Sequence, residues 1–238
     1  MKNILIPTVL EKDTLASVES AISYANGQNF DLVLLLLNET DNAYSASAYL
    51  RNSKPAFSAS QQKTLEDCQR LALKFDNIKL HVQRQSSISA PLLRNLLSVL
   101  EIGFVIVPKS FRESSKKINR HCLGLLANSH CPILNLCDAP TSEMQKALYL
   151  EYAESKLQVS DLQQRLDGKF AFRIVSQARI NKQEERSLDQ LLLETITRND
   201  IDLLVETRKP TKVKLGKKFP SFHDDLKLPV LSVFEEIR

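Results

Sequence analysis

Basic side chains gather in one segment that directly follows an apolar run. The run, Phe104–Val107, is typical of a buried strand, and a site at its carboxyl end would suit an open α/β sheet. Ammonium and guanidinium groups bind phosphate and other anions through charge-assisted hydrogen bonds. The segment predicts either a site for a small anionic ligand or a solvated basic loop, and both interpretations stay open. The cations are Lys109, Arg112, Lys116, Lys117 and Arg120.

A second basic segment follows another apolar run, Asp202–Val205. The few aromatic residues near it and the absence of Trp leave little surface on which nucleic-acid bases could stack. The net charge of +4, from 32 basic and 28 acidic residues, is too small to indicate a nucleic-acid partner. We therefore do not expect nucleic acid to bind. The cations of this segment are Arg208, Lys209, Lys212, Lys214, Lys217 and Lys218.

Two His-Cys pairs, His121-Cys122 and His130-Cys131, have the residue types of a metal site. On one expected helix, over 118–129 and ending beside His130, positions nine residues apart lie roughly 13 Å apart on opposite faces. Such side chains cannot share one ion. We expect structural roles for them and no metal site.

Catalytic patterns are absent from the sequence. There is no Gly-x-Ser-x-Gly motif that would present a nucleophilic serine. His223 stands beside Asp224, and the pair predicts either a dyad with an unidentified serine or the polar start of a helix. We expect no catalytic residues and no enzyme activity.

Strands and helices alternate along the first part of the chain. Amphipathic helices are expected after Asp13, around Leu65, after Ser89 and over 118–129. The alternation predicts right-handed crossovers and a doubly wound parallel sheet, an α/β fold. The expected strands are Asn3–Thr8, Leu32–Leu37, Ile78–Val82, Phe104–Val107 and Pro132–Leu136.

The second part repeats this pattern in shortened form. Strands are expected at Ala147–Glu151 and Phe170–Val175, helices at Lys156–Asp167 and Glu184–Arg198. Residues 202–205 and 228–233 then match 104–107 and 131–136 at an offset near 97 to 99 residues, which indicates an internal duplication. We predict a complete domain over 1–138, a linker over 139–145 and a truncated second copy over 146–238. The missing unit corresponds to Leu32 through Phe75.

Two short sequences, Lys2–Thr8 and Ala127–Leu134, together with the element order, resemble the universal stress protein family. The resemblance implies an adenine nucleotide alpha hydrolase-like sheet of order 3-2-1-4-5. Tandem members look like fused dimers whose fifth strands meet. It therefore implies an intramolecular pseudo-dimer of the two repeats, and we expect a homodimer in solution. Unpaired, the fifth strands would be exposed edges.

Members of that family that bind ATP carry an aspartate after the Pro-Thr of strand one and Gly-x2-Gly-x9-Gly-Ser/Thr after strand four. Here Val9 stands at the aspartate position, and residues 108–120 contain no glycine. Asn119 and Arg120 fall where the last Gly and the Ser/Thr would be. Glycines let backbone N–H groups approach phosphate without a Cβ in the way. We therefore expect no ATP cofactor.

The resulting prediction is a universal-stress-protein-like stress-response protein that acts as a non-catalytic binding or interaction module, with a protein or a small anion as partner. The alternative is a sensor of a nucleotide or another phosphorylated ligand. No signal peptide or stretch of about 20 apolar residues is evident, so we expect a cytoplasmic protein with no membrane association and free thiols. The candidate ligand-binding residues are Thr8, Lys109, Arg112, Lys116, Lys117, Asn119 and Arg120.

Overall fold

The computed structural model describes residues 3–25, 27–38, 57–137, 144–152, 155, 157–166, 170–180, 185–209 and 226–235. Among these residues the chain divides into two compact units, the first over 3–126 and the second from 127 onward. Most of the predicted linker 139–145 lies outside the described residues. The division falls inside a helix, and the segment after it contacts the later part of the chain: Ile133–Asn135 pair with Val230–Ser232, and the carbonyl of Ala127 accepts from Arg208.

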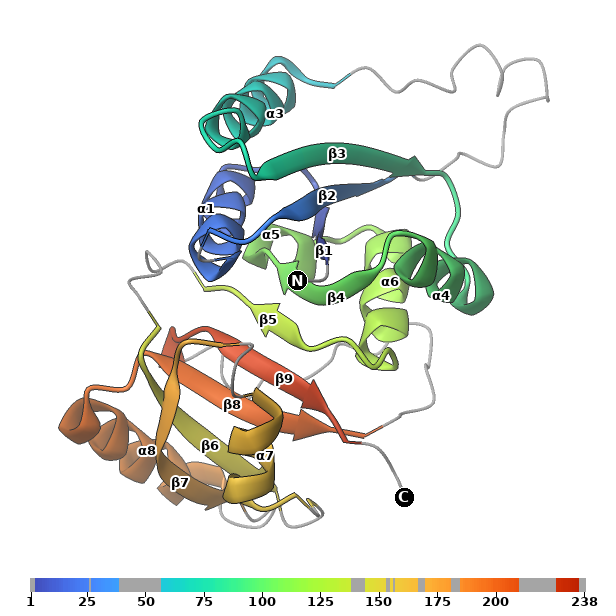
Figure 1. Cartoon of the computed structure of the whole chain (residues 1–238). Helices are drawn as coiled ribbons and strands as arrows, with labels where there is room; N and C mark the ends of the chain where they lie inside the picture. Colours follow the sequence, from blue (N-terminus) through green and yellow to red (C-terminus); the bar gives the residue numbers. More distant parts are fainter. Residues whose placement is uncertain are drawn as a thin grey trace. The chain divides into compact units, whose positions relative to one another are not determined.

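The first unit is a parallel sheet with helices on both faces. The strand order β3-β2-β1-β4 agrees with the first four positions of the predicted order 3-2-1-4-5, and the α/β fold class is confirmed. Figure 1 shows α1 and α3 on one side of these strands and α4 and α6 on the other. The elements are β1 Asn3–Thr8, α1 Asp13–Ala25, β2 Phe30–Leu37, α3 Ala59–Ala72, β3 Ile78–Gln85, α4 Ala90–Val99, β4 Ile102–Val107, α5 Lys109–Arg112 and α6 Lys117–Ala127.

Local sequence signals explain several of these elements. The six-residue apolar run Leu32–Leu37 is buried along its whole length, as a strand covered on both faces requires. Ser89 caps α4, because its hydroxyl accepts the N–H of Leu92 at 3.4 Å, and Ser58 with Gln61 forms a capping box on α3. The short helix α5 was not predicted and lies within the expected basic loop.

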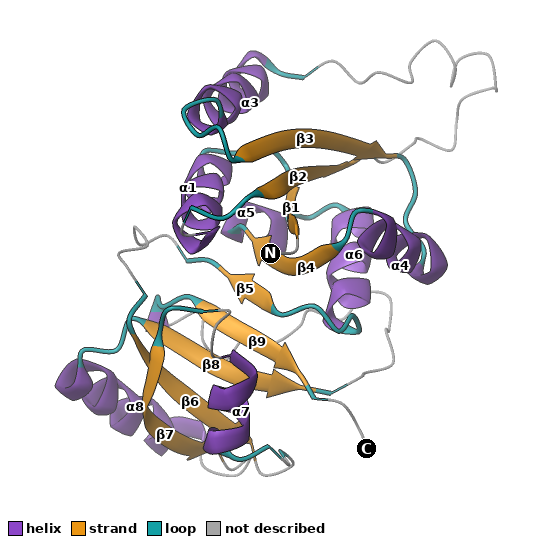
Figure 2. Ribbon diagram, viewed as in Figure 1, coloured by secondary structure: helices purple, strands orange, loops and turns teal. Residues whose placement is uncertain are grey.

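The strands of the second unit follow the order β5-β9-β8-β6-β7. β5 runs antiparallel to β9, and the other neighbours are parallel. Figure 2 shows α7 and α8 on opposite sides of β6 and β7, as consecutive right-handed crossovers in opposite directions require. The elements are β5 Ile133–Asn135, β6 Lys146–Tyr152, α7 Val159–Leu166, β7 Arg173–Ile180, α8 Glu185–Asn199, β8 Leu203–Arg208 and β9 Val230–Phe234.

The side chains of successive β6 residues point to opposite faces of the sheet. Leu148 and Leu150 pack with Leu192 of α8 in one apolar cluster. Tyr149 is fully buried and, by the alternation of a strand, points to the opposite face. β7 starts at Arg173 and not at Phe170 as predicted, because Phe170 and Phe172 pack against each other before the strand begins.

The two units share features at corresponding positions. Glu101 before β4 and Asp200 before β8, 99 residues apart, both have the left-handed conformation, with φ of 49° and 54°. β7 lies beside β6 as β2 lies beside β1. By sheet position, the strand without a counterpart among the described residues is therefore the outer strand β3, whereas the sequence interpretation assigned the missing unit to Leu32 through Phe75.

None of the described helices combines the length and the hydrophobicity that crossing a bilayer requires.

Candidate ligand site at the ends of β1 and β4

The hydroxyl groups of Thr8 and Thr14 meet at the end of β1. Thr8 is buried, and its Oγ1 accepts the N–H of Leu10 at 2.9 Å. The same oxygen lies 2.7 Å from the hydroxyl of Thr14 in the first turn of α1. Leu10 has a left-handed backbone, with φ of 60°, and its side chain is fully buried. The chain thus turns inward after β1 and fills this corner with a leucine.

A carboxylate occupies the start of α5. Asp13 Oδ2 accepts the N–H of Ser110 at 2.7 Å, and Asp13 Oδ1 accepts the hydroxyl of Ser110, also at 2.7 Å. A negative charge is favourable at free N–H groups that begin a helix, which is why phosphate groups bind in such places. Here the chain supplies that negative charge itself.

The sequence interpretation missed this role of Asp13. It assigned Asp13 only to the start of α1, and no short-range pattern connects that residue with Ser110, 97 residues later. The only available signal was the spacing of both residues just beyond two expected strands, since adjacent parallel strands end at the same edge of a sheet.

Two of the predicted site residues, Asn119 and Arg120, bind the segment that precedes α6. The side chain of Asn119 is buried, and its Nδ2 donates to Ser114 Oγ at 2.9 Å. Arg120 Nη2 donates to the carbonyl of Ser115 at 3.2 Å. Side chains therefore fill the positions where a glycine motif would leave room for phosphate.

The other predicted residues lie around this segment without forming one site with Thr8. Lys109 is half-buried and lies 3.9 Å from Glu113, one turn along α5, while Arg112 is half-buried in the same helix. Lys116 and Lys117 are exposed at the start of α6. The arrangement can attract an anion to the surface, but Thr8 Oγ1 and Asn119 Nδ2 are already bonded to the chain.

The corresponding strand ends of the second unit carry a chain of hydroxyl groups. Tyr149 Oη donates to the carbonyl of Leu157 at 3.2 Å and lies 3.0 Å from Ser155 Oγ. Ser155 Oγ in turn lies 3.0 Å from Thr207 Oγ1. These hydrogen-bonded hydroxyl groups connect the residues after β6 with the end of β8.

A tyrosine and a glutamate also meet near the ends of β6 and β8. Tyr152 Oη donates to Glu206 Oε2 at 3.3 Å. Burial, and secondarily the neighbouring Glu206 carboxylate, raise the pKa of the Tyr152 hydroxyl. Tyr152 is therefore protonated at neutral pH and acts as a hydrogen-bond donor.

Only the start of the second basic segment is described. Lys209 lies 3.8 Å from the buried carboxylate of Glu235. Lys212, Lys214, Lys217 and Lys218, with His223 and Asp224, lie outside the described residues. Whether this segment binds an anion stays a prediction.

Within the described residues, no group of three or more His, Cys, Asp or Glu side chains is arranged to hold a metal ion. α6 ends at Ala127, and His130 lies just beyond this end, close to the helix C-terminus as predicted. The His130 ring packs against Phe234, with ring centres 4.5 Å apart. Cys122 is buried, and this burial raises the pKa of its thiol to about 12.

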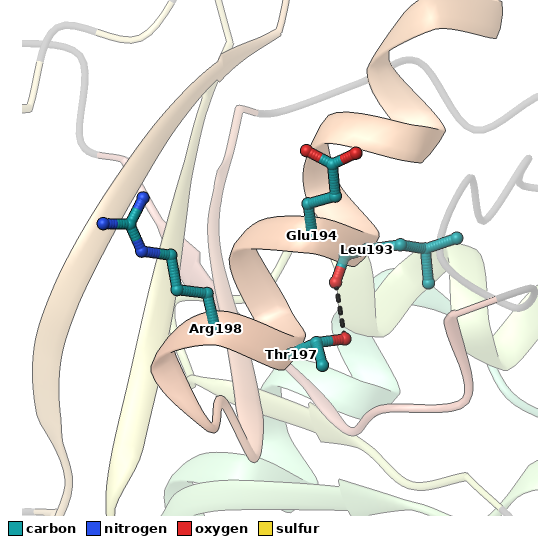
Figure 3. A pocket seen from close by; sticks show the side chains of 4 residues that line it. All are labelled: Leu193, Glu194, Thr197 and Arg198. Carbon is teal, nitrogen blue, oxygen red and sulfur yellow. Dashed lines mark hydrogen bonds between the residues drawn. The ribbon is translucent and has the colours of Figure 1, made fainter.

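A separate hollow lies on the outer face of α8. Its volume is about 530 Å³, and it is lined by Leu193, Glu194, Thr197 and Arg198 (Figure 3). Thr197 Oγ1 donates to the carbonyl of Leu193 at 2.8 Å, so this hydroxyl is already bonded within the helix. The hollow contains none of the predicted site residues.

No protein-family model matches the chain, and no curated protein matches it. Among solved structures, a universal stress protein from Archaeoglobus fulgidus DSM 4304 is 11% identical, with a TM-score of 0.54 over 98% of this chain and 96% of that chain. A functionally unknown protein from Pseudomonas aeruginosa PAO1 is 12% identical, with a TM-score of 0.48 over 98% and 92% of the two chains. A universal stress protein family member from Burkholderia pseudomallei is 13% identical, covers 57% of this chain and 96% of its own, and has a TM-score of 0.38. The chain therefore has the fold of a universal stress protein.

Proposed function

We propose that this chain is a universal-stress-protein-like, stress-linked binding or interaction module of the cytoplasm that has lost the ATP site and performs no catalysis. The observation that carries the proposal is the Asp13 carboxylate on the N–H and hydroxyl of Ser110. A phosphate group at that place would have to displace this carboxylate and would be repelled by it. The Asp13 carboxylate thus takes the place that a bound phosphate would occupy.

The side chains around that contact support the same proposal. Leu10 and Phe111 are fully buried, and Asn119 is buried and bonded to Ser114. A nucleotide would need these side chains to leave a packed interior, at a cost comparable to that of disrupting a protein core.

The test is thermal unfolding of the full chain with millimolar Mg-ATP, ADP, AMP and inorganic phosphate. We expect an unchanged midpoint with each ligand. Binding at a hundred times Kd would stabilise the folded state by about 2.7 kcal/mol and raise the midpoint by several degrees. Sodium sulfate at matched ionic strength controls for general salt effects. A shift specific to one nucleotide would overturn the loss of the ATP site.

The absence of catalysis has its own test. Release of phosphate from Mg-ATP is measured over hours against a buffer blank and against a heat-unfolded sample. We expect the three rates to agree. Turnover that disappears on unfolding would contradict the non-catalytic proposal even if no stable binding were detected.

A second candidate is a sensor of a phosphorylated ligand. The exposed Lys116 and Lys117 at the start of α6 favour it, because two cations there could attract an anion without the closed interior opening. The double variant Lys116→Ala/Lys117→Ala is compared with Lys63→Ala/Lys74→Ala, which removes equal charge from an exposed part of the first unit. A ligand-dependent midpoint shift that only the first variant loses would establish the sensor.

We also propose that the two repeats form a pseudo-dimer within one chain and that the chain forms a homodimer. The antiparallel pairing of β5 with β9 and the shared left-handed residues before β4 and β8 support the first part. Sedimentation velocity tests the second part. We expect a species of twice the chain mass of 27.0 kDa, and a monomer at all concentrations would contradict it.

A further inference from the structure

The side chain of Arg208, at the end of β8, is surrounded by backbone carbonyl groups. Its Nε donates to the carbonyl of Ala127 at 3.0 Å, and its Nη2 donates to that of Ser129 at 3.0 Å. Nη2 also donates to the carbonyl of Cys131, and Nη1 donates to that of Ser232. One side chain therefore binds three carbonyls of the segment 127–131 and one of β9.

The carbonyl of Ala127 needs a donor from outside the helix. Ala127 is the last residue of α6, and the last four carbonyls of a helix have no partner within it. A guanidinium group presents five N–H donors in a fixed plane, and its positive charge is favourable at the carbonyl end of a helix. Lysine, with a single ammonium group, cannot reach several carbonyls in this planar arrangement.

Neighbouring side chains leave Arg208 half-buried. The ring of Phe234 lies 5.8 Å from the guanidinium carbon and also packs against His130. Burial lowers the pKa of Arg208 to about 10, which still leaves the group charged at neutral pH. A buried charge is tolerated only while it is fully hydrogen-bonded, so the carbonyls and the guanidinium depend on each other.

We propose that Arg208 is a conformational clamp that makes residues 127–135 fold with the second half of the chain. The clamp places the segment before β5 so that Ile133 and Asn135 meet Ser232 and Val230 in the β5–β9 pair. The inference is independent of the proposed function. It also means that the second basic segment begins with a cation that already donates four hydrogen bonds to carbonyls, so Arg208 is not part of an anion site.

The test is hydrogen–deuterium exchange on the full-length Arg208→Lys variant. We expect amides in 127–137 and 230–235 to exchange at least about tenfold faster, while amides in β1 and β2 keep their rates. Arg198→Lys, on the exposed face of α8, is the matched control and should leave every rate unchanged. Unchanged rates in 127–137 of Arg208→Lys would overturn the clamp, and so would equal acceleration throughout the chain.

A milder variant covers the case in which Arg208→Lys does not fold. Phe234→Leu removes the ring beside the guanidinium and keeps an apolar side chain. We expect a smaller acceleration confined to the same two segments. Acceleration that spreads to β1 and β2, or none in 127–137, would contradict the clamp.

Discussion

The ends of β1 and β4 in the first unit and the ends of β6 and β8 in the second are corresponding places that are closed by different chemistry. In the first unit a charge fills this position, because Asp13 binds the first turn of α5. In the second unit a neutral chain of hydroxyl groups does so, from Tyr149 through Ser155 to Thr207. The comparison teaches that a parallel sheet must satisfy the polar groups at this edge, and that side chains can do so where no ligand does.

The largest expected difference between the two units is in thiol reactivity. Cys68 and Cys122 of the first unit are buried, and burial raises the pKa of each thiol from 9.0 to about 12. The fraction of reactive thiolate at pH 8 is then about a thousandfold lower than for an ordinary thiol. Iodoacetamide labelling followed by peptide mass spectrometry should therefore modify the half-buried Cys131 and Cys137 first.

Labelling in guanidinium chloride provides the control, since all four thiols should then react alike. Equal labelling rates of Cys68 and Cys131 in the folded protein would contradict the expected difference in thiol reactivity between the units.

Removing the charge that closes the first unit should have the next largest effect. Asp13→Ala deletes two charge-assisted hydrogen bonds and leaves the start of α5 without its acceptor. We expect the free energy of unfolding to fall by about 1.5–3 kcal/mol, measured by urea denaturation. Glu11→Ala removes an exposed carboxylate nearby and should change it by less than about 0.5 kcal/mol. Equal effects of the two variants would show that the Asp13 contact adds nothing.

Removing a hydroxyl from the neutral network of the second unit should lower the free energy of unfolding by less than removing the Asp13 carboxylate does. Tyr149→Phe keeps the buried ring but removes the hydroxyl that bonds Leu157 and Ser155. We expect a loss of about 1–1.5 kcal/mol in the free energy of unfolding. Thr195→Val in α8, distant from this network in the sequence, tests whether any hydroxyl of the unit would give the same loss. A larger loss for Tyr149→Phe than for Asp13→Ala would reverse the comparison between charged and neutral closure.

The smallest expected effect concerns the left-handed residues before β4 and β8. Glycine adopts this conformation without a Cβ penalty, so Glu101→Gly should raise the free energy of unfolding by about 0.5 kcal/mol. Asp200→Gly should gain less, because Asp200 also lies 3.3 Å from Lys146 in an exposed ion pair. Thermal midpoints measured side by side check both changes. Destabilisation by Glu101→Gly would mean that its backbone carries no strain.

The fold was predictable because its signals are local. The unbroken apolar run Leu32–Leu37 indicates a strand covered on both faces, and it is one. Ser89 indicates the start of α4. The error at β7 has a physical cause: Phe170 and Phe172 look like a strand interior, whereas the strand that follows alternates exposed and inward residues from Arg173 to Ile180.

The candidate site was only partly predictable. Asn119 and Arg120 could be placed at the glycine positions by counting along the sequence, but their hydrogen bonds to Ser114 and Ser115 could not. α5 was missed, because four residues are too short for a periodic pattern and the carboxylate at its start comes from Asp13.

The sequence by itself determined the alternation of strands and helices, the parallel sheet and the lack of glycines at the phosphate position. These depend on residue types and spacing within a few turns of the chain. Only the tertiary structure decided which side chains take the place of a ligand, since Asp13 and Ser110 are brought together by adjacent strand ends. It also decided that the end of α6 belongs with Arg208, a contact between residues some 80 positions apart that no local pattern encodes.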